Sequence, residues 1–365
     1  MTRLRAFTWF LVAVIYFIVA RDIASRAASG LASGDFVPLA DRIILLFLLV
    51  VGYAAMGYVG QRQREPIKAM GLARRPGPLS MTTREFALGS AIGWAGMVAC
   101  VLPIALTGGL VITLYTTPRQ FALVFLDLAI LAVAALAQEV AFRGYPFQRL
   151  IEATNPVIAT IFISLLLALV QLANPGPDDS APTFASTIVT ILVGWLLAIA
   201  YLRTRALWVG WGFHFAWNAT MAILFGLPIS GTTTFSPVVS SNTVGPLWIT
   251  GGDYGPEGSL ICAIVVLVLI FVLISATRDL KYRYAQPVIV PAGIPVDIDA
   301  ISRRQHEAAM GPAAPAPPQI VQISGVQIPS PEQVASPASL DENVTGASQN
   351  NQASEESGRT RIESS

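Results

Sequence analysis

Two pairs of polar residues interrupt apolar stretches of this sequence, and each pair is spaced by four positions. The first pair is Glu139 and Arg143, and the second is His214 and Asn218. Residues four apart lie on one face of an α-helix, so each pair forms a single polar patch. Because an ionisable group in hydrocarbon costs about 3 kcal/mol or more, such residues seldom occur there by chance. The two pairs predict either a polar site between membrane helices or polar contacts that join helices.

Each pair has a structural and a chemical interpretation. Glu139 precedes Arg143, which is the favourable order for a helical ion pair, and such a pair neutralises itself. His214 is the one histidine within the apolar part of the chain. A neutral imidazole binds a metal or relays a proton, with Asn218 as a hydrogen-bonding support, or it is simply buried against a carboxylate. One histidine is a small donor set for zinc, which normally has several His, Cys or carboxylate ligands.

Two glutamines accompany these pairs. Gln138 directly precedes Glu139, so the two side chains point about 100° apart around a helix and cannot serve one ligand in the same way. Gln171 lies at the end of the apolar stretch 165–171. A lone glutamine in such a place is more often a contact between helices than a catalyst.

Other polar or small residues have structural interpretations. Gly89 and Gly93 predict close helix packing. Glu257 precedes the last apolar stretch, where it complements the N-terminal dipole of that helix. Cys100 and Cys262 both lie in apolar stretches, and we interpret them as packing residues rather than as a disulfide or a zinc site.

The composition shows what kind of elements position these residues. The chain is 54% apolar and 12% charged, against about 25% charged residues in ordinary soluble domains. Its mean hydropathy is +0.61. Long apolar runs alternate with short polar loops, as in polytopic helical membrane proteins. The net charge of +1 gives no indication of a nucleic-acid partner; the expected surroundings are the lipid bilayer.

The apolar runs predict an all-α fold, a transmembrane bundle of about eight helices. The first run resembles a signal peptide, but Ala20-Arg21-Asp22 is a poor cleavage site and further spans follow, so we interpret the run as a retained helix. The predicted spans are 6–21, 42–60, 86–108, 121–142, 157–173, 185–202, 207–226 and 259–276.

Basic residues near span ends favour the cytoplasmic side and predict that both termini lie inside. A basic loop follows the second span, whereas the loop 227–258 has no Lys or Arg. Simple alternation then places Glu139 near the inner face and the end of the fifth span near the outer face. A shallow or re-entrant segment at 144–156 would bring them closer, and Pro146 permits a break there.

Three regions follow from this pattern. Residues 1–84 are the N-terminal transmembrane helices and the basic cytoplasmic loop. Residues 85–280 are the membrane domain that holds the polar pairs. Residues 285–365, rich in Pro, Ala, Ser, Gln and Glu, predict a disordered cytoplasmic tail.

Together these residues resemble the motifs of the CAAX protease and bacteriocin-processing (CPBP, or Abi) family of intramembrane metalloproteases. Its first motif, Glu-Glu-x-x-x-Arg, is similar to 138–143. Its second motif, Phe-x-x-x-His, falls on 167–171, and its third, His-x-x-x-Asn/Asp, is intact at 214–218. The resemblance covers about 85–280. It implies a bundle of about eight helices around a polar cavity and, from the style of the motifs, a bacterial inner-membrane location.

In proteolytic members of that family the first glutamate would activate water, and two histidines with the asparagine would hold a divalent, zinc-like metal or an oxyanion. The resemblance thus assigns site roles to Glu139, Arg143, His214 and Asn218, with His214 and Asn218 as metal ligands. Gln138 stands where the first glutamate is expected, and Gln171 stands where the first histidine is expected. An amide is not a general base near neutral pH and is a weaker metal ligand than imidazole.

Three hypotheses result. The first is a CAAX-protease-like protein with impaired or lost peptidase activity and a retained polar cavity for a membrane peptide or a lipidated protein. The second is an active intramembrane metallo-endopeptidase that uses Glu139, His214 and Asn218. The third is a small-solute transporter or a membrane scaffold.

Overall fold

The structure is a computed structural model that describes residues 2–73, 81–172, 184–231, 235 and 237–277, and the backbone of two short strands beyond them. The described residues up to 277 lie in one compact unit. The two strands, β3 (Val288–Ile289) and β4 (Pro295–Val296), pair antiparallel. The rest of the predicted tail, 285–365, lies outside the described residues.

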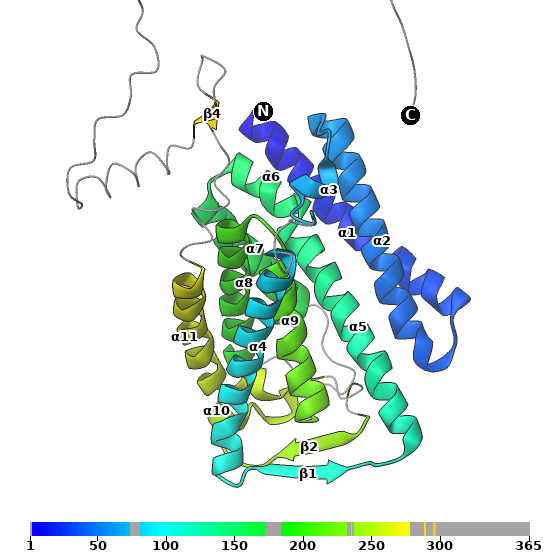
Figure 1. The fold of residues 1–365 in the computed structure, drawn as a ribbon, viewed down its shortest axis with the longest axis vertical. Helices are drawn as coiled ribbons and strands as arrows, with labels where there is room; N and C mark the ends of the chain where they lie inside the picture. Colours follow the sequence, from blue (N-terminus) through cyan, green and yellow to red (C-terminus); the bar gives the residue numbers. More distant parts are fainter. Residues whose placement is uncertain are drawn as a thin grey trace, which may run out of the picture. The chain divides into compact units, whose positions relative to one another are not determined.

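Apolar helices make up the unit, and each of the eight predicted spans corresponds to one of them (Figure 1). The chain is therefore an all-α polytopic bundle. The helices are α1 (Arg3–Leu31), α2 (Val37–Gln61), α4 (Met81–Leu106), α5 (Pro118–Arg143), α7 (Pro156–Leu172), α8 (Phe184–Thr204), α9 (Trp208–Ala219) and α11 (Leu260–Ala276).

The helices differ in length. Among the described residues, five helical segments are long and apolar enough to cross a membrane: α1, α2 with the short turn before it, α4, α5 with the helix after it, and α8. Helices α7 and α11 are apolar but have 17 residues each. Helix α9 has 12 residues and continues as a π-helical turn, Thr220–Leu224. Helix α1 extends beyond its predicted end because the polar residues there continue the helix, with Asp22 and Arg26 in an ion pair of 2.8 Å.

Large apolar side chains on the outside of the bundle indicate that it lies in a membrane. Phe47 is 65% exposed, Phe125 76% and Phe271 72%. In water, contiguous apolar surface of this kind is unfavourable, whereas lipid chains cover it without cost. The protein is an integral membrane protein.

Glycines let α4 and α9 approach so closely that their backbones touch. A methyl group added at Gly89 would overlap the carbonyl oxygen of Val209, and one added at Gly93 would overlap that of Phe213. Gly212 of α9 faces the carbonyl of Phe86 in the same way. The predicted close packing at Gly89 and Gly93 is present, and it fixes α9, the helix that carries His214.

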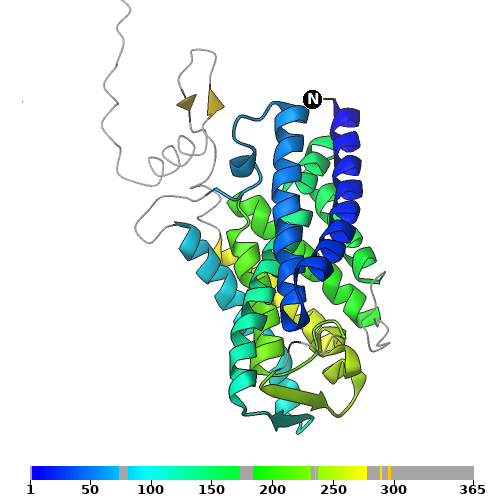
Figure 2. The ribbon, with the colours of Figure 1, turned by 90° about the vertical axis from the view of Figure 1, so that its right-hand side faces the viewer.

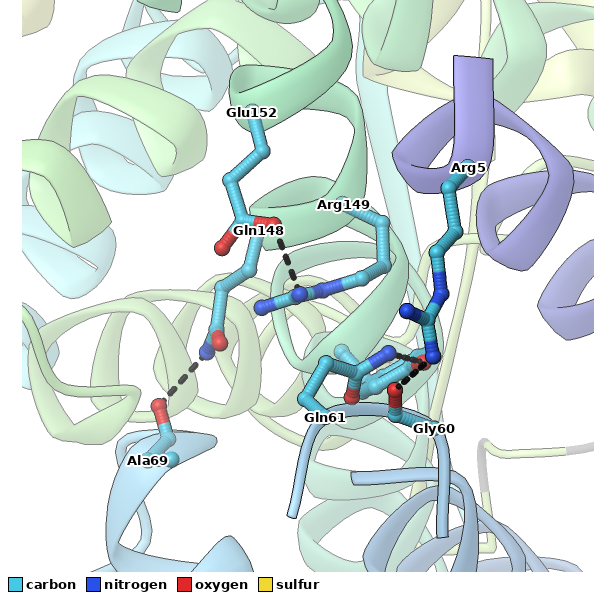
Figure 3. Close-up of polar contacts among 8 residues, drawn as sticks. Arg5, Gly60, Gln61, Ala69, Gln148, Arg149 and Glu152 are labelled. Carbon is cyan, nitrogen blue, oxygen red and sulfur yellow. Dashed lines mark hydrogen bonds and ion pairs between the residues drawn. The ribbon is translucent and has the colours of Figure 1, made fainter. Parts of the chain in front are cut away.

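A short helix lies between α5 and α7, where the sequence predicts a break. This helix, α6 (Tyr145–Ala153), and the four-residue helix α3 (Pro66–Ala69) lie at the same end of the bundle as the N-terminus (Figures 1 and 2). Gln148 of α6 donates a hydrogen bond of 2.6 Å to the Ala69 carbonyl (Figure 3). Gln61 at the end of α2 donates one of 2.6 Å to the Tyr145 hydroxyl.

These contacts hold α6 against the first two helices. Arg5 of α1 donates a hydrogen bond of 3.0 Å to the Gly60 carbonyl of α2, and Arg149 pairs with Glu152 at 2.7 Å (Figure 3). After α5 the chain passes through α6 and then re-enters the bundle as α7. The end of α7 can therefore lie beside the last turns of α5.

A small sheet was not predicted. Strands β1 (Leu110–Leu114) and β2 (Val239–Thr243) pair antiparallel, with Ile112 opposite Ser241, at the end of the bundle opposite α6 (Figure 1). The β-branched residues in Leu-Val-Ile-Thr-Leu favour a strand, but the partner strand lies more than 120 residues later. The pairing links the segment before α5 to the loop before α11.

The contact between α4 and α9 leads to a first prediction. The variant Gly89→Ala should lower the melting temperature of the detergent-solubilised protein by several degrees, because the new methyl group must push α9 away. The matched control is Gly30→Ala, since no atom lies within 4 Å of a methyl group there. An unchanged melting temperature in both variants would contradict the close approach.

Candidate functional site

Three residues of the predicted site form a buried polar cluster where α5 meets α9. Glu139 is 1% exposed and Arg143 is fully buried. The Arg143 Nη1 lies 3.6 Å from the Glu139 Oε1, and the His214 Nδ1 lies 3.4 Å from the same oxygen. The sequence pairs 139/143 and 214/218 thus meet through Glu139 and His214. We call Glu139, Arg143 and His214 the carboxylate cluster.

Backbone groups of α8 and α9 complete the surroundings of the carboxylate cluster. Arg143 donates a hydrogen bond of 3.3 Å to the carbonyl oxygen of Gly194 in α8. A methyl group at Gly210 of α9 would lie 2.6 Å from the Glu139 Oε2, so a larger residue there would force the acid to shift. Trp211 also links α9 to α5, because its indole donates a hydrogen bond of 2.8 Å to the Ala132 carbonyl.

The polar contacts within the carboxylate cluster are long. Charge-assisted hydrogen bonds are usually about 2.7–2.9 Å long, and both contacts to Glu139 are longer. In the described part of the chain, the Arg143 Nε and Nη1 have no hydrogen-bond partner. Buried polar atoms without partners are rare, so this guanidinium can accept a further ligand. The cluster can hold a negative charge or pass a proton between carboxylate and imidazole.

The two glutamines face elsewhere. Gln138 and Gln171 line one cavity of about 240 Å³ between α1, α2, α5 and α7. We call it the glutamine cavity. Among the described residues that line this cavity, Glu139 is absent. Adjacent residues 138 and 139 therefore serve different faces of α5, as the helical angle between them requires.

Asn218 does not join the carboxylate cluster. It is half-buried on α9, and its side chain has no hydrogen bond to the part of the chain that the structure describes. The described residues contain no group of three or more His, Cys, Asp or Glu that would hold a metal. Moreover, the one carboxylate beside His214 is shared with a guanidinium, whose positive charge opposes a cation. This donor set does not fit a zinc ion.

The loop before α11 supplies polar residues that the sequence did not reveal. Gln171 donates a hydrogen bond of 3.2 Å to the hydroxyl of Tyr254, which is 4% exposed. Burial raises the pKa of Tyr254, so this hydroxyl keeps its proton at neutral pH. No local motif marks Tyr254, because its partner is 83 residues away.

Glu257 is also bound to α9. Trp217 and Ser230 each donate a hydrogen bond of 2.9 Å to its carboxylate. The N-terminus of α11 is capped by the Ser259 hydroxyl, which accepts a 3.1 Å bond from the Cys262 amide. Cys262 is a buried free thiol, as is Cys100, and the two contact each other within the packed interior.

The buried ion pair leads to a second prediction. Arg143→Met leaves the Glu139 carboxylate without its charge partner, and should reduce the free energy of unfolding by about 3–5 kcal/mol. Adding Glu139→Gln should restore part of that loss. The matched control is Arg26→Met, which breaks an exposed pair of the same spacing and should leave the free energy of unfolding nearly unchanged. Equal losses in both variants would refute a structural role for the buried pair.

The Tyr254 hydroxyl leads to a third prediction. Tyr254→Phe should lower the free energy of unfolding by about 1–2 kcal/mol, because the Gln171 amide loses its acceptor. Tyr58→Phe is the control, since Tyr58 is 66% exposed. Thermal unfolding of both variants in the same detergent provides the comparison, and a neutral Tyr254→Phe would show that the bond does not stabilise the fold.

Comparison with known proteins agrees with the motifs. Residues 119–220 match the family described as type II CAAX prenyl endopeptidase Rce1-like. No curated protein and no solved structure matches the chain. The matched segment runs from the start of α5 to the end of α9 and holds the whole carboxylate cluster and both glutamines, whereas α1, α2, α4 and α11 lie outside it. Through this segment, the chain is similar to the CAAX protease family of membrane proteins.

Proposed function

We propose that this protein is a CAAX-protease-like membrane protein whose peptidase activity is impaired or lost, and that its polar cavity binds a peptide or a lipid-linked ligand. The observation that supports this most directly is the glutamine cavity. The two positions where the family resemblance implies a glutamate and a histidine are both occupied by neutral amides, and both amides line the same cavity. Amides donate and accept hydrogen bonds but do not activate water.

Glu139 does not replace the missing base in this proposal. It is 1% exposed, lies between Arg143 and His214, and does not belong to the described lining of the glutamine cavity. A base must reach the proton that it abstracts, within hydrogen-bonding distance or through one water. We therefore assign Glu139, Arg143 and His214 to the alignment of α5, α8 and α9. Asn218 has no partner role in this arrangement.

We further propose a bacterial inner-membrane protein with both termini in the cytoplasm. Basic residues favour the cytoplasmic side of a membrane helix. Arg5, Arg62, Lys68 and Arg149 lie in or beside α1, α2, α3 and α6 at the N-terminal end of the bundle (Figure 1). That end would face the cytoplasm, and the sheet of β1 and β2 would face the outside.

A fourth prediction tests the loss of activity. Wild-type protein purified in detergent should contain no zinc above background and should not cleave a fluorogenic peptide that ends in a prenylated CAAX sequence. The double variant Gln138→Glu with Gln171→His restores the two groups that the family resemblance implies, so it is the form in which cleavage should appear if these two positions account for the loss. Each single variant is a matched control, because it restores only one of the two groups.

The competing hypotheses give other results. About one zinc per wild-type chain, lost together with cleavage in Glu139→Ala and His214→Ala, would establish the active metallo-endopeptidase instead. Transport of a solute by wild-type proteoliposomes that persists in both alanine variants would favour the transporter or scaffold. Either result would overturn the proposal.

A further inference from the structure

The glutamine cavity has an apolar interior and a basic mouth. Leu45, Phe142 and Leu167 in its wall are 4–6% exposed. Phe17 of α1 closes one side, with its ring centroid 5.7 Å from that of Phe142. Arg21 in the lining is exposed. The exposed Arg21 therefore marks the mouth of the cavity, and the buried apolar residues form its inner wall.

Two cations line the mouth. Arg21 comes from α1 and Arg42 from α2, and no carboxylate is among the described residues that line the cavity. The Arg42 side chain is 39% exposed and lies 3.2 Å from Asp41, which offsets part of its charge. A guanidinium binds phosphate through two parallel hydrogen bonds, so this mouth is suited to an anionic group.

The two arginines lie at the level of lipid head groups. Arg21 is 18 residues after Arg3, the first residue of α1, and therefore about 27 Å along the helix axis. The hydrocarbon core of a bilayer is about 30 Å thick. If the start of α1 lies at one interface, Arg21 lies near the other. Arg42, close to the start of α2, returns from that same interface.

The size of the cavity restricts its occupant. Its volume of about 240 Å³ is below the roughly 300–1,000 Å³ of drug-sized ligand sites. A single narrow chain fits such a space better than a folded peptide segment. The amides of Gln138 and Gln171 provide donors for an ester carbonyl on that chain.

We propose that the glutamine cavity binds an anionic phospholipid, with its phosphate at Arg21 and Arg42 and part of one acyl chain against Phe17, Leu45 and Leu167. This inference rests on the proposed function, in which the cavity binds a ligand, and specifies the ligand's chemistry. Both arginines of the mouth come from α1 and α2, which lie outside the segment that matches the family. The ligand is therefore particular to this chain's own N-terminal helices.

Native mass spectrometry of the full-length, delipidated protein tests this inference. Phosphatidylglycerol should bind at least about tenfold more tightly than phosphatidylcholine with the same acyl chains. Arg21→Gln with Arg42→Gln should abolish that preference. The matched control is Arg26→Gln with Arg119→Gln, which removes two arginines paired with Asp22 and Asp35, one in α1 and one at the start of α5. The control should keep the preference.

A second pair of variants tests the apolar part. Leu167→Trp fills the cavity and should weaken phosphatidylglycerol binding about tenfold, whereas Leu165→Trp, on the 45% exposed outer face of α7, should leave it unchanged. Size-exclusion chromatography checks that each variant is folded. If Leu167→Trp does not fold, the test rests on the Arg21 and Arg42 variants and their control.

Several outcomes would overturn the inference. They are equal binding of the two lipids, equal effects of the arginine variants and their control, or displacement of the lipid by a peptide with a free C-terminal carboxylate but not by its amidated form. Zinc content and cleavage are measured on the same preparation. A protein without zinc, cleavage or lipid preference would refute the lipid assignment and leave the loss of peptidase activity intact.

Discussion

The buried Glu139 carboxylate is the group on which the arrangement of α5, α8 and α9 depends. A charge in a low-dielectric interior is stable only with partners. Its partners are Arg143, from its own helix, and His214, from α9. Arg143 in turn donates a hydrogen bond to a backbone carbonyl of α8. Because Glu139 lies against Gly210, where a methyl group would come within 2.6 Å of its Oε2, the three helices pack closely around the acid. The positions of the neighbouring amides, Gln138 and Gln171, depend on this alignment.

Helix α5 separates two environments that differ in chemistry. On one face, charged groups are closed off from lipid and bound to one another. On the other face, Gln138 lines a space shared with two helices that the family segment does not include. The polar residues of the loop before α11 join the second environment through Tyr254 and Gln171. A chain with amides at these two positions thereby keeps the polar framework around them, since the framework also stabilises the bundle.

Much of this architecture could be predicted from the sequence, because long apolar runs leave few alternatives to membrane helices. The meeting of Glu139 with His214 followed from the family motifs and from helical spacing. The shared cavity of Gln138 and Gln171 did not, because it depends on how α1 and α2 pack against α5 and α7. The pairing of β1 with β2 and the Tyr254 bond were likewise missed, since each joins residues more than 80 positions apart. The tail lies outside the described residues, so its predicted disorder stays a prediction.

The glycine contact between α4 and α9 also determines how a molecule could travel within the membrane plane. Where two backbones touch, with no side chains between them, a lipid tail has no space to enter. A lipid therefore cannot diffuse laterally into the bundle between α4 and α9. The glutamine cavity lies elsewhere, between α1, α2, α5 and α7, so a ligand from the bilayer would approach it between those helices. The hairpin of α1 and α2 would then act as the entrance to the protein rather than as a simple anchor.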